Sequence, residues 1–202
     1  LSMTSVWNVA SVTSMAAMRP TLSAVHDGDR ESLHEYPRNA HDWTREDMSD
    51  IPGIDIRPVT AWLDANVDGA VGPYRFEVIA GGHSNLTFRV VGASGPQLVL
   101  RRPPLGHVLA SAHDMGREHR ILAALQGTAV PVPQVEGFCD DLSVNGAPFY
   151  VMRFVDGHVL RDRETAERVL SEAARSNASR SIVDTMAAIH AVDLEAVGLY
   201  EL

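Results

Sequence analysis

The sequence predicts an α+β fold: a five-stranded antiparallel sheet with one helix inserted between its third and fourth strands. Three short segments rich in β-branched and aromatic residues follow one another across glycine-containing turns, which is typical of consecutive antiparallel strands. A helical segment comes next, and two further strand segments follow it with an Asn-Gly turn between them. The predicted strands are Phe76–Ile79, Leu86–Val91, Leu98–Arg101, Val135–Cys139 and Pro148–Phe154.

The chain divides into three regions. Residues 1–50 are rich in Ser, Thr, Asp, His and Arg and show no sustained hydrophobic period, so we expect a disordered N-terminal extension. Residues 51–156 hold the predicted sheet and form the first folded domain. Residues 157–202 hold two predicted helices, Arg163–Arg175 and Ser179–Ala191, and form a second, helical region.

A helix is expected before the first strand. Asp55 precedes it, and Pro58 falls in its first turn, where the missing N–H of a proline is tolerated. Val59, Trp62 and Leu63 give this helix one apolar face. The residues expected to end it are Asn66, Gly69 and Gly72-Pro73.

The helix between the third and fourth strands, Ser111–Gln126, carries a carboxylate on its apolar side. Four residues share one stripe with i, i+3, i+7 and i+10 spacing: Met115, Glu118, Leu122 and Leu125. A buried carboxylate without a partner costs several kcal/mol. We therefore expect Glu118 to meet a cation, with Arg101 as the first candidate. A position near solvent, or a local contact with Arg117 or Arg120, is the alternative.

The composition excludes several classes of function. The formal charge is −9, from 17 basic and 26 acidic residues, whereas a nucleic-acid or membrane-surface binder needs a basic face. The only cysteine, Cys139, allows no internal disulfide. No apolar run approaches the ~18 residues of a membrane span, and the first residues do not resemble a signal peptide. We expect a cytoplasmic protein.

The turn between the first two strands carries the most informative chemistry. Gly81 and Gly82 lack Cβ, so the backbone there can approach an anion closely. Free N–H groups in such a turn can hold phosphate oxygens. His83 follows, and Ser84 and Asn85 add polar side chains. An ordinary hairpin is the alternative, because Gly-Gly pairs are common in hairpin turns.

Alternation along the third strand places Val99 and Arg101 on one face and Leu98, Leu100 and Arg102 on the other. Val99 could pack against an apolar base while Arg101 reaches phosphates through its bidentate fork. A solvated charge at a strand end is the simpler interpretation of either arginine.

The last strand runs from an apolar segment into a turn at Asp156. A buried core strand is its simplest interpretation. In a nucleotide site, its exit would offer backbone N–H and C=O groups to the edge of a base. The residues at this exit are Met152, Arg153, Phe154 and Val155.

Five motifs stand in a characteristic order: G-G-H-S-N-L-T-F-R-V, L-V-L-R-R-P-P, S-A-H-D-M-G-R-E-H-R-I-L, V-P-V-P and F-Y-V-M-R-F-V-D-G-H-V-L. Together they resemble the aminoglycoside phosphotransferase and choline kinase-like family, which has the protein-kinase-like fold. The likeness covers about residues 55–202. The subgroup resembles phosphotransferase-like domains that stand alone in mycobacteria or are fused to acyl-CoA dehydrogenases.

This resemblance implies transfer of the γ-phosphate of ATP to a small-molecule hydroxyl, with ATP and Mg²⁺ as cofactors. It implies that Gly81–Asn85 cover the nucleotide and that Arg101 takes the place of the third-strand lysine of protein kinases. Glu118 would be the helix partner of Arg101, and Met152–Val155 would be the hinge against adenine. The acceptor stays open: an aminoglycoside, choline, a sugar or a hydroxyacyl thioester.

By the same resemblance, residues 51–156 correspond to the nucleotide-binding N-lobe and residues 157–202 to the first helices of an incomplete C-lobe. The family's catalytic loop, H-G-D followed by an Asn, and its later magnesium-binding Asp do not occur after Asp156. We therefore assign no catalytic residue and no metal ligand. We expect a chain truncated before the catalytic loop that does not phosphorylate a substrate by itself.

Two other possibilities stay open. One is a non-catalytic nucleotide-binding or scaffolding module, and the other is an unrelated α+β protein with a similar hairpin. If the lower lobe is incomplete, its first helices would leave apolar faces uncovered, which predicts self-association.

Overall fold

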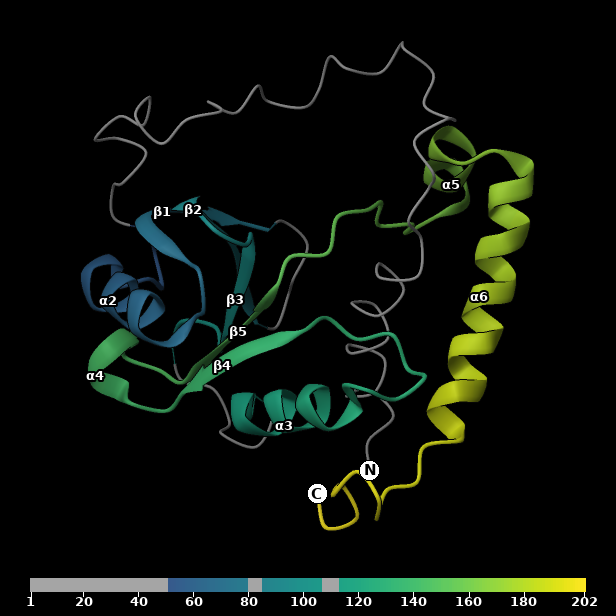
Figure 1. The fold of residues 1–202 in the computed structure, drawn as a ribbon. Helices are drawn as coiled ribbons and strands as arrows, with labels where there is room; N and C mark the ends of the chain where they lie inside the picture. The colour runs from purple at the N-terminus through teal and green to yellow at the C-terminus, as the bar shows by residue number, and fades with distance from the viewer. Residues whose placement is uncertain (1–50, 80–84, 107–112) are drawn as a thin grey trace. The chain divides into compact units, whose positions relative to one another are not determined.

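The computed structural model describes residues 51–79, 85–106 and 113–202 (Figure 1). The helices are α2 (Ile56–Asn66), α3 (Met115–Leu125), α4 (Leu142–Asn145), α5 (Arg163–Val169) and α6 (Glu172–His190). The strands are β1 (Val71–Val78), β2 (Leu86–Ser94), β3 (Leu98–Arg102), β4 (Val135–Cys139) and β5 (Phe149–Arg153). The predicted extension, residues 1–50, lies outside the described residues.

The chain forms two compact units. The sheet unit contains the described residues of 51–120 and 134–154, and the helical unit contains residues 121–133 and 155–202. The division falls within α3, so the first half of that helix belongs to the sheet unit. The domain boundaries expected from the sequence stay a prediction.

The sheet has five strands in the order β1-β2-β3-β5-β4, and all neighbouring pairs are antiparallel. The helix α3 lies between the third and fourth strands along the chain. This arrangement confirms the predicted α+β class with its five-stranded antiparallel sheet and inserted helix.

Local boundaries differ from the prediction at several points. The dipeptide Gly72-Pro73, expected to end the first helix, lies inside β1, where the pairing with β2 is irregular between Val71 and Tyr74. The predicted Asn145-Gly146 turn is the end of the short helix α4, with Gly146 in the left-handed conformation at φ 65°. The last two helices separate at Ser171, which caps α6 through the amide of Ala174, and not near Ser179.

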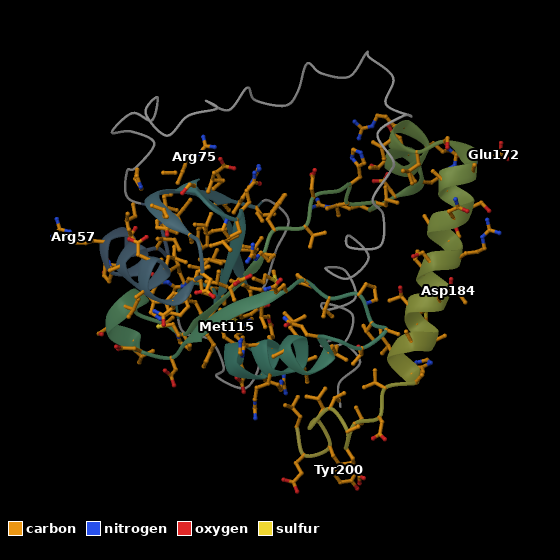
Figure 2. All side chains as sticks on the ribbon, in the orientation of Figure 1. Arg57, Arg75, Met115, Glu172, Asp184 and Tyr200 are labelled. Carbon is orange, nitrogen blue, oxygen red and sulfur yellow. The ribbon has the colours of Figure 1, made fainter. Side chains whose placement is uncertain are left out.

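The hydrophobic core lies on one face of the sheet, against α2. Val59 and Leu63 of α2 are fully buried there, as are Phe88 of β2 and Phe149 of β5. Trp62 meets the ring of Phe149 edge-on, with ring centroids 5.0 Å apart. The opposite side of α2 carries the exposed Arg57 (Figure 2). The predicted apolar face of this helix is therefore the face that builds the core.

In the turn between β2 and β3, the backbone of Gly95 lies very close to that of Gly69. Gly95 has φ +94°, and a Cβ added there would stand 2.0 Å from the carbonyl oxygen of Gly69. Only glycine fits both conditions, because L-residues rarely adopt this φ and the space is already filled by backbone.

Arg102, at the end of β3, is buried on the core face. Its Nη1 donates to the carbonyl oxygens of Gly53 and Asn145 at 2.7 and 3.2 Å, and its Nε donates to the carbonyl oxygen of Pro103 at 3.1 Å. The expectation that this arginine could be a solvated charge is wrong, because three main-chain carbonyls replace water around it.

The helical unit contains α5 and α6. Asp162 caps α5 by accepting from the amide of Thr165 at 2.7 Å. None of the helices in the described part of the chain is long and apolar enough to cross a membrane.

Candidate functional site

The residues predicted to bind a nucleotide divide into two groups. Gly81, Gly82, His83 and Ser84 lie outside the described residues. Asn85, the next residue, is described and is only 5 % exposed. The remaining predicted residues belong to β3, α3, β5 and the segment directly after β5.

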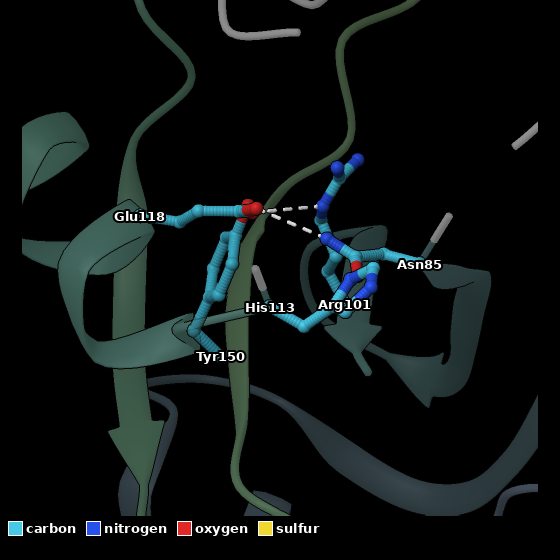
Figure 3. A network of polar contacts seen from close by, with 5 residues as sticks. All are labelled: Asn85, Arg101, His113, Glu118 and Tyr150. Atoms are coloured by element: carbon cyan, nitrogen blue, oxygen red, sulfur yellow. Dashed lines mark hydrogen bonds and ion pairs between the residues drawn. The ribbon is translucent and has the colours of Figure 1, made fainter. Parts of the chain in front are cut away.

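Glu118 is the centre of a polar network on the face of the sheet opposite the core (Figure 3). Its Oε2 accepts from Nε of Arg101 at 3.0 Å and from the hydroxyl of Tyr150 at 3.1 Å. Its Oε1 accepts from Nδ2 of Asn85 at 3.0 Å. The ion pair between Arg101 and Glu118 expected from the sequence is therefore confirmed.

The secondary structure explains why these side chains meet. Arg101 of β3 and Tyr150 of β5 are directly paired in the antiparallel ladder, so their side chains leave the sheet on the same face. Asp114 caps α3 by accepting from the amide of Arg117 at 2.8 Å. Glu118 then lies in the first turn of α3, on the side that faces the sheet.

His113, the residue before the α3 cap Asp114, also belongs to the Glu118 network. Its Nδ1 lies 2.6 Å from Oδ1 of Asn85. Since Nδ2 of Asn85 donates to Glu118, Oδ1 acts as the acceptor and Nδ1 of His113 carries the proton. Sequence reasoning missed both His113 and Tyr150. The strand alternation that placed Arg101 could have found Tyr150 once β3 and β5 were taken as neighbours.

Burial changes the acidity of two side chains near Glu118. The pKa of Tyr150 is raised well above its ordinary value, first by burial and then by the charge of Glu118. Its hydroxyl therefore keeps its proton and acts as a donor. His119, which stacks on Phe138 with ring centroids 5.5 Å apart, has a pKa lowered by burial.

Val99 and Met152 lie beside this network. They are paired across β3 and β5, two residues along the strands from Arg101 and Tyr150, and therefore lie on the same face of the sheet. Their exposed fractions are 5 % and 4 %. Val99 and Met152 are therefore buried apolar neighbours of the polar cluster, and their contact with a base stays a prediction.

The side chains that follow Met152 make contacts within the sheet unit. Arg153 forms an ion pair with Glu136 of β4. The ring of Phe154 lies under the guanidinium of Arg89, 4.6 Å from its carbon to the ring centroid. These two side chains hold the end of β5 to its neighbours, so a role toward a ligand would fall to their backbone.

The backbone of this segment is also partly occupied. The amide of Arg153 donates to the carbonyl oxygen of Gln134 at 2.7 Å, and that of Phe154 donates to Gln97 at 2.9 Å. Within the described residues, the amide of Val155 has no such partner. The contact of this segment with the edge of a base stays a prediction.

The guanidinium of Arg101 is only partly used. Among the described residues, its Nε is bonded to Glu118 and its two terminal nitrogens have no hydrogen-bond partner. Figure 3 shows these nitrogens extending past the carboxylate. A free guanidinium edge fits a phosphate, because two parallel N–H groups match two phosphate oxygens.

The same region does not fit a magnesium ion. The described residues contain no group of three or more His, Cys, Asp or Glu side chains that could hold a metal. Both oxygens of Glu118 already accept hydrogen bonds. The network can therefore bind an anion through Arg101, but it supplies no metal site.

Comparison with known proteins places the chain among phosphotransferases. The model of the phosphotransferase enzyme family matches residues 75–201, which is more than half of the chain. A crystal structure of a Ralstonia eutropha protein assigned as an aminoglycoside phosphotransferase matches with a TM-score of 0.60 and 37 % identity. The match covers 73 % of this chain and 41 % of that one.

Curated relatives point the same way. A probable acyl-CoA dehydrogenase of Arabidopsis thaliana is 38 % identical over 141 residues, which cover 66 % of this chain and 17 % of that protein. Acyl-CoA dehydrogenase family member 11 of Rattus norvegicus is 33 % identical over 164 residues, covering 78 % of this chain and 21 % of that protein. The chain thus spans about a fifth of these relatives. It belongs to the phosphotransferase enzyme family.

Proposed function

We propose that this chain binds ATP on the α3 face of its sheet, as the nucleotide-binding part of a kinase that transfers the γ-phosphate to a small-molecule hydroxyl. The observation that carries the proposal is the Arg101–Glu118 ion pair, in which the carboxylate fixes a guanidinium whose terminal edge has no partner among the described residues. Family membership supplies the reaction class.

Arg101 binds the phosphates in this proposal. Its side chain is 11 % exposed, so a phosphate would meet a guanidinium already largely removed from water. Electrostatic attraction is stronger there than at a fully hydrated surface. Gly81, Gly82, His83 and Ser84 would cover the phosphates from above through backbone amides.

The base would lie against Val99 and Met152, with its polar edge toward the backbone at Val155. These two side chains are apolar and lie beside Arg101 on the same face of the sheet, which suits the flat face of an adenine. They are buried in the chain without ligand, so an adenine would displace the side chains that cover them. The free amide of Val155 offers a donor for a ring nitrogen.

Phosphoryl transfer needs further groups. A bound Mg²⁺ would neutralise charge on the β- and γ-phosphates, and a positioned carboxylate would orient the acceptor hydroxyl. The described residues assign neither, so the 202-residue chain should bind nucleotide without transferring phosphate. A non-catalytic nucleotide-binding or scaffolding module is the alternative, and it predicts the same binding.

Calorimetric titration with ATP tests the proposal. Arg101→Met removes the phosphate-binding edge and should abolish measurable binding. Arg57→Met removes an exposed arginine from α2 and is the matched control for charge, so its affinity should equal that of the parent chain.

A thermal-shift measurement provides an independent check. Ligand binding stabilises the folded state by RT ln(1 + [L]/Kd), which is about 1 kcal/mol when the ligand is a few-fold above Kd. If millimolar ATP, with and without Mg²⁺, gives neither heat nor a thermal shift, the proposed function is wrong.

We also propose that the helical unit self-associates through α6. Three large apolar side chains on this helix are more than half exposed: Ile182 at 52 %, Val183 at 65 % and Met186 at 52 %. Contiguous exposed apolar surface of this kind tends to become an interface. Sedimentation should show mass increasing with concentration, and Val183→Ser should reduce it. A constant monomer mass would contradict this proposal.

A further inference from the structure

We propose that Asn85 and Tyr150 are positioning residues that orient the Glu118 carboxylate so that it binds Arg101 through Nε alone. This orientation leaves the terminal edge of Arg101 open for phosphate. The identity of the ligand rests on the proposed function, whereas the orientation of the carboxylate can be tested without any ligand.

The contacts of Glu118 are divided unequally between its two oxygens. An arginine and a carboxylate commonly form two parallel hydrogen bonds, one to each oxygen. Here Oε1 is bonded to Nδ2 of Asn85 at 3.0 Å, and only Oε2 meets Arg101, also at 3.0 Å. Asn85 therefore holds the oxygen that a second bond from Arg101 would need, and fixes the direction in which the carboxylate points.

Asn85 is itself fixed on its other side. Its Oδ1 lies 2.6 Å from Nδ1 of His113, and the residue is 5 % exposed. An amide that is bonded at both ends cannot rotate without losing a buried hydrogen bond, which is costly. This arrangement keeps the amide N–H directed at Glu118.

Tyr150 fixes the second oxygen. Its hydroxyl donates to Oε2 at 3.1 Å, and its backbone is paired with that of Arg101 in the sheet. The residue is 3 % exposed, and its ring lies 6.4 Å from that of His119. Because the ring is held by the strand and by this packing, the hydroxyl prevents the carboxylate from rotating about its Cγ–Cδ bond.

Removing either contact should change what Arg101 does. Without Asn85, no donor holds Oε1 in place, so the carboxylate can turn and Arg101 can close onto it with two hydrogen bonds. The ion pair would then be stronger, but one edge of the guanidinium would no longer be free. The expected result is a tighter internal pair with weaker phosphate binding.

The first experiment compares affinities for ATP and adenosine by calorimetry. Tyr150→Phe and Asn85→Ala should each weaken ATP binding about five-fold, the size of one lost hydrogen bond, and leave adenosine binding unchanged. Tyr74→Phe is the matched control. Tyr74 is 2 % exposed and donates its hydroxyl to Asp64 at 2.7 Å, on the core side of the sheet. Its removal should change neither affinity.

The second experiment observes the arginine directly in the chain without ligand. The Nε–H signal of Arg101 in a proton–nitrogen NMR spectrum can be assigned by its loss in Arg101→Lys. In Asn85→Ala, separate terminal N–H signals of Arg101 should appear, because a guanidinium bonded at two points rotates slowly. In Tyr150→Phe the Nε–H signal should shift, whereas Tyr74→Phe should leave it unchanged.

The two experiments separate the two proposals. If the parent chain binds no nucleotide, the proposed function fails, and the NMR comparison still decides the positioning roles. Unchanged Arg101 signals in both variants would overturn those roles, and so would equal weakening of ATP and adenosine. Tyr150→Phe removes one oxygen atom from a residue on a central strand, so it keeps the test valid if Asn85→Ala does not fold.

Discussion

Arg101 and Arg102 are neighbours in sequence, but they lie on opposite faces of the sheet and have different hydrogen-bond partners. Arg102 lies on the core side, where its guanidinium is surrounded by main-chain carbonyl oxygens of Gly53, Pro103 and Asn145. Arg101 lies on the α3 side, where one of its nitrogens meets Glu118 and the other two are unpaired among the described residues. Arg102 thus donates through two nitrogens to main-chain groups of the fold, whereas Arg101 donates through one nitrogen to a side chain.

The two faces of the sheet differ in the same way as the two arginines. The core face is apolar, and Arg102, the buried cation found there among the described residues, is hydrogen-bonded to carbonyl groups of the main chain. The α3 face carries a linked set of polar side chains beside an apolar strip. Substitutions on the core face should therefore affect stability, and substitutions on the α3 face should affect binding.

The largest effect is expected for Phe88→Ala. Phe88 is fully buried in the core, so the change should lower the free energy of unfolding by about 4 kcal/mol through lost burial and a cavity. Thr87→Ala, on the other face of β2, is the control and should cost less than about 1 kcal/mol. Denaturant titration measures both. Equal losses would show that the two faces do not differ as described.

A sharper test compares the two arginines. Arg102→Ala leaves three carbonyl oxygens without a donor, and it should lower the free energy of unfolding by about 3 kcal/mol. Arg101→Ala should lower it by less than about 1 kcal/mol, since Glu118 is partly exposed and keeps two other donors. If Arg101→Ala is the more destabilising of the two substitutions, the assignment of Arg102 as the stabilising arginine is wrong.

The smallest effect is expected from pH. Burial lowers the pKa of His119 in the folded chain, so below its ordinary pKa of about 6.5 the unfolded chain takes up the proton first. The stability contributed by neutral His119 is thus complete above that pH and declines as the pH falls toward the folded pKa. The melting temperature of His119→Gln should depend less on pH than that of the parent. Identical profiles would exclude this role.

Much of the α3 face could be predicted from the sequence. The stripe on the inserted helix placed Glu118 on an apolar side, and strand alternation placed Arg101 on one face of β3, so the ion pair followed from two periodicities. Tyr150 did not follow, because the last strand is apolar throughout and its pattern indicates only burial. Its role depends on which strands are neighbours, and β5 lies beside β3 although β4 precedes it in the chain.

Other features depended on contacts that a local pattern does not contain. A solvated charge is the simpler interpretation of Arg102 from sequence, since nothing near it shows that the carbonyl groups of Gly53 and Asn145 will accept its hydrogen bonds. Gly72-Pro73 resembled a helix end, but tertiary pairing with β2 draws it into a strand. The nucleotide contacts of the predicted residues stay a prediction.

The glycine at position 95 has a consequence for how β3 is aligned. The segment L-V-L-R-R is almost the same pattern when shifted by one residue, since both faces would still receive apolar side chains and then an arginine. The strand therefore contains little information about its own alignment, although a shift of one would exchange its two faces. The turn at Gly95, pressed against Gly69, supplies that information. The turn at Gly95 thus contributes to the alignment in which Arg102 lies on the core face and Arg101 on the face of Glu118.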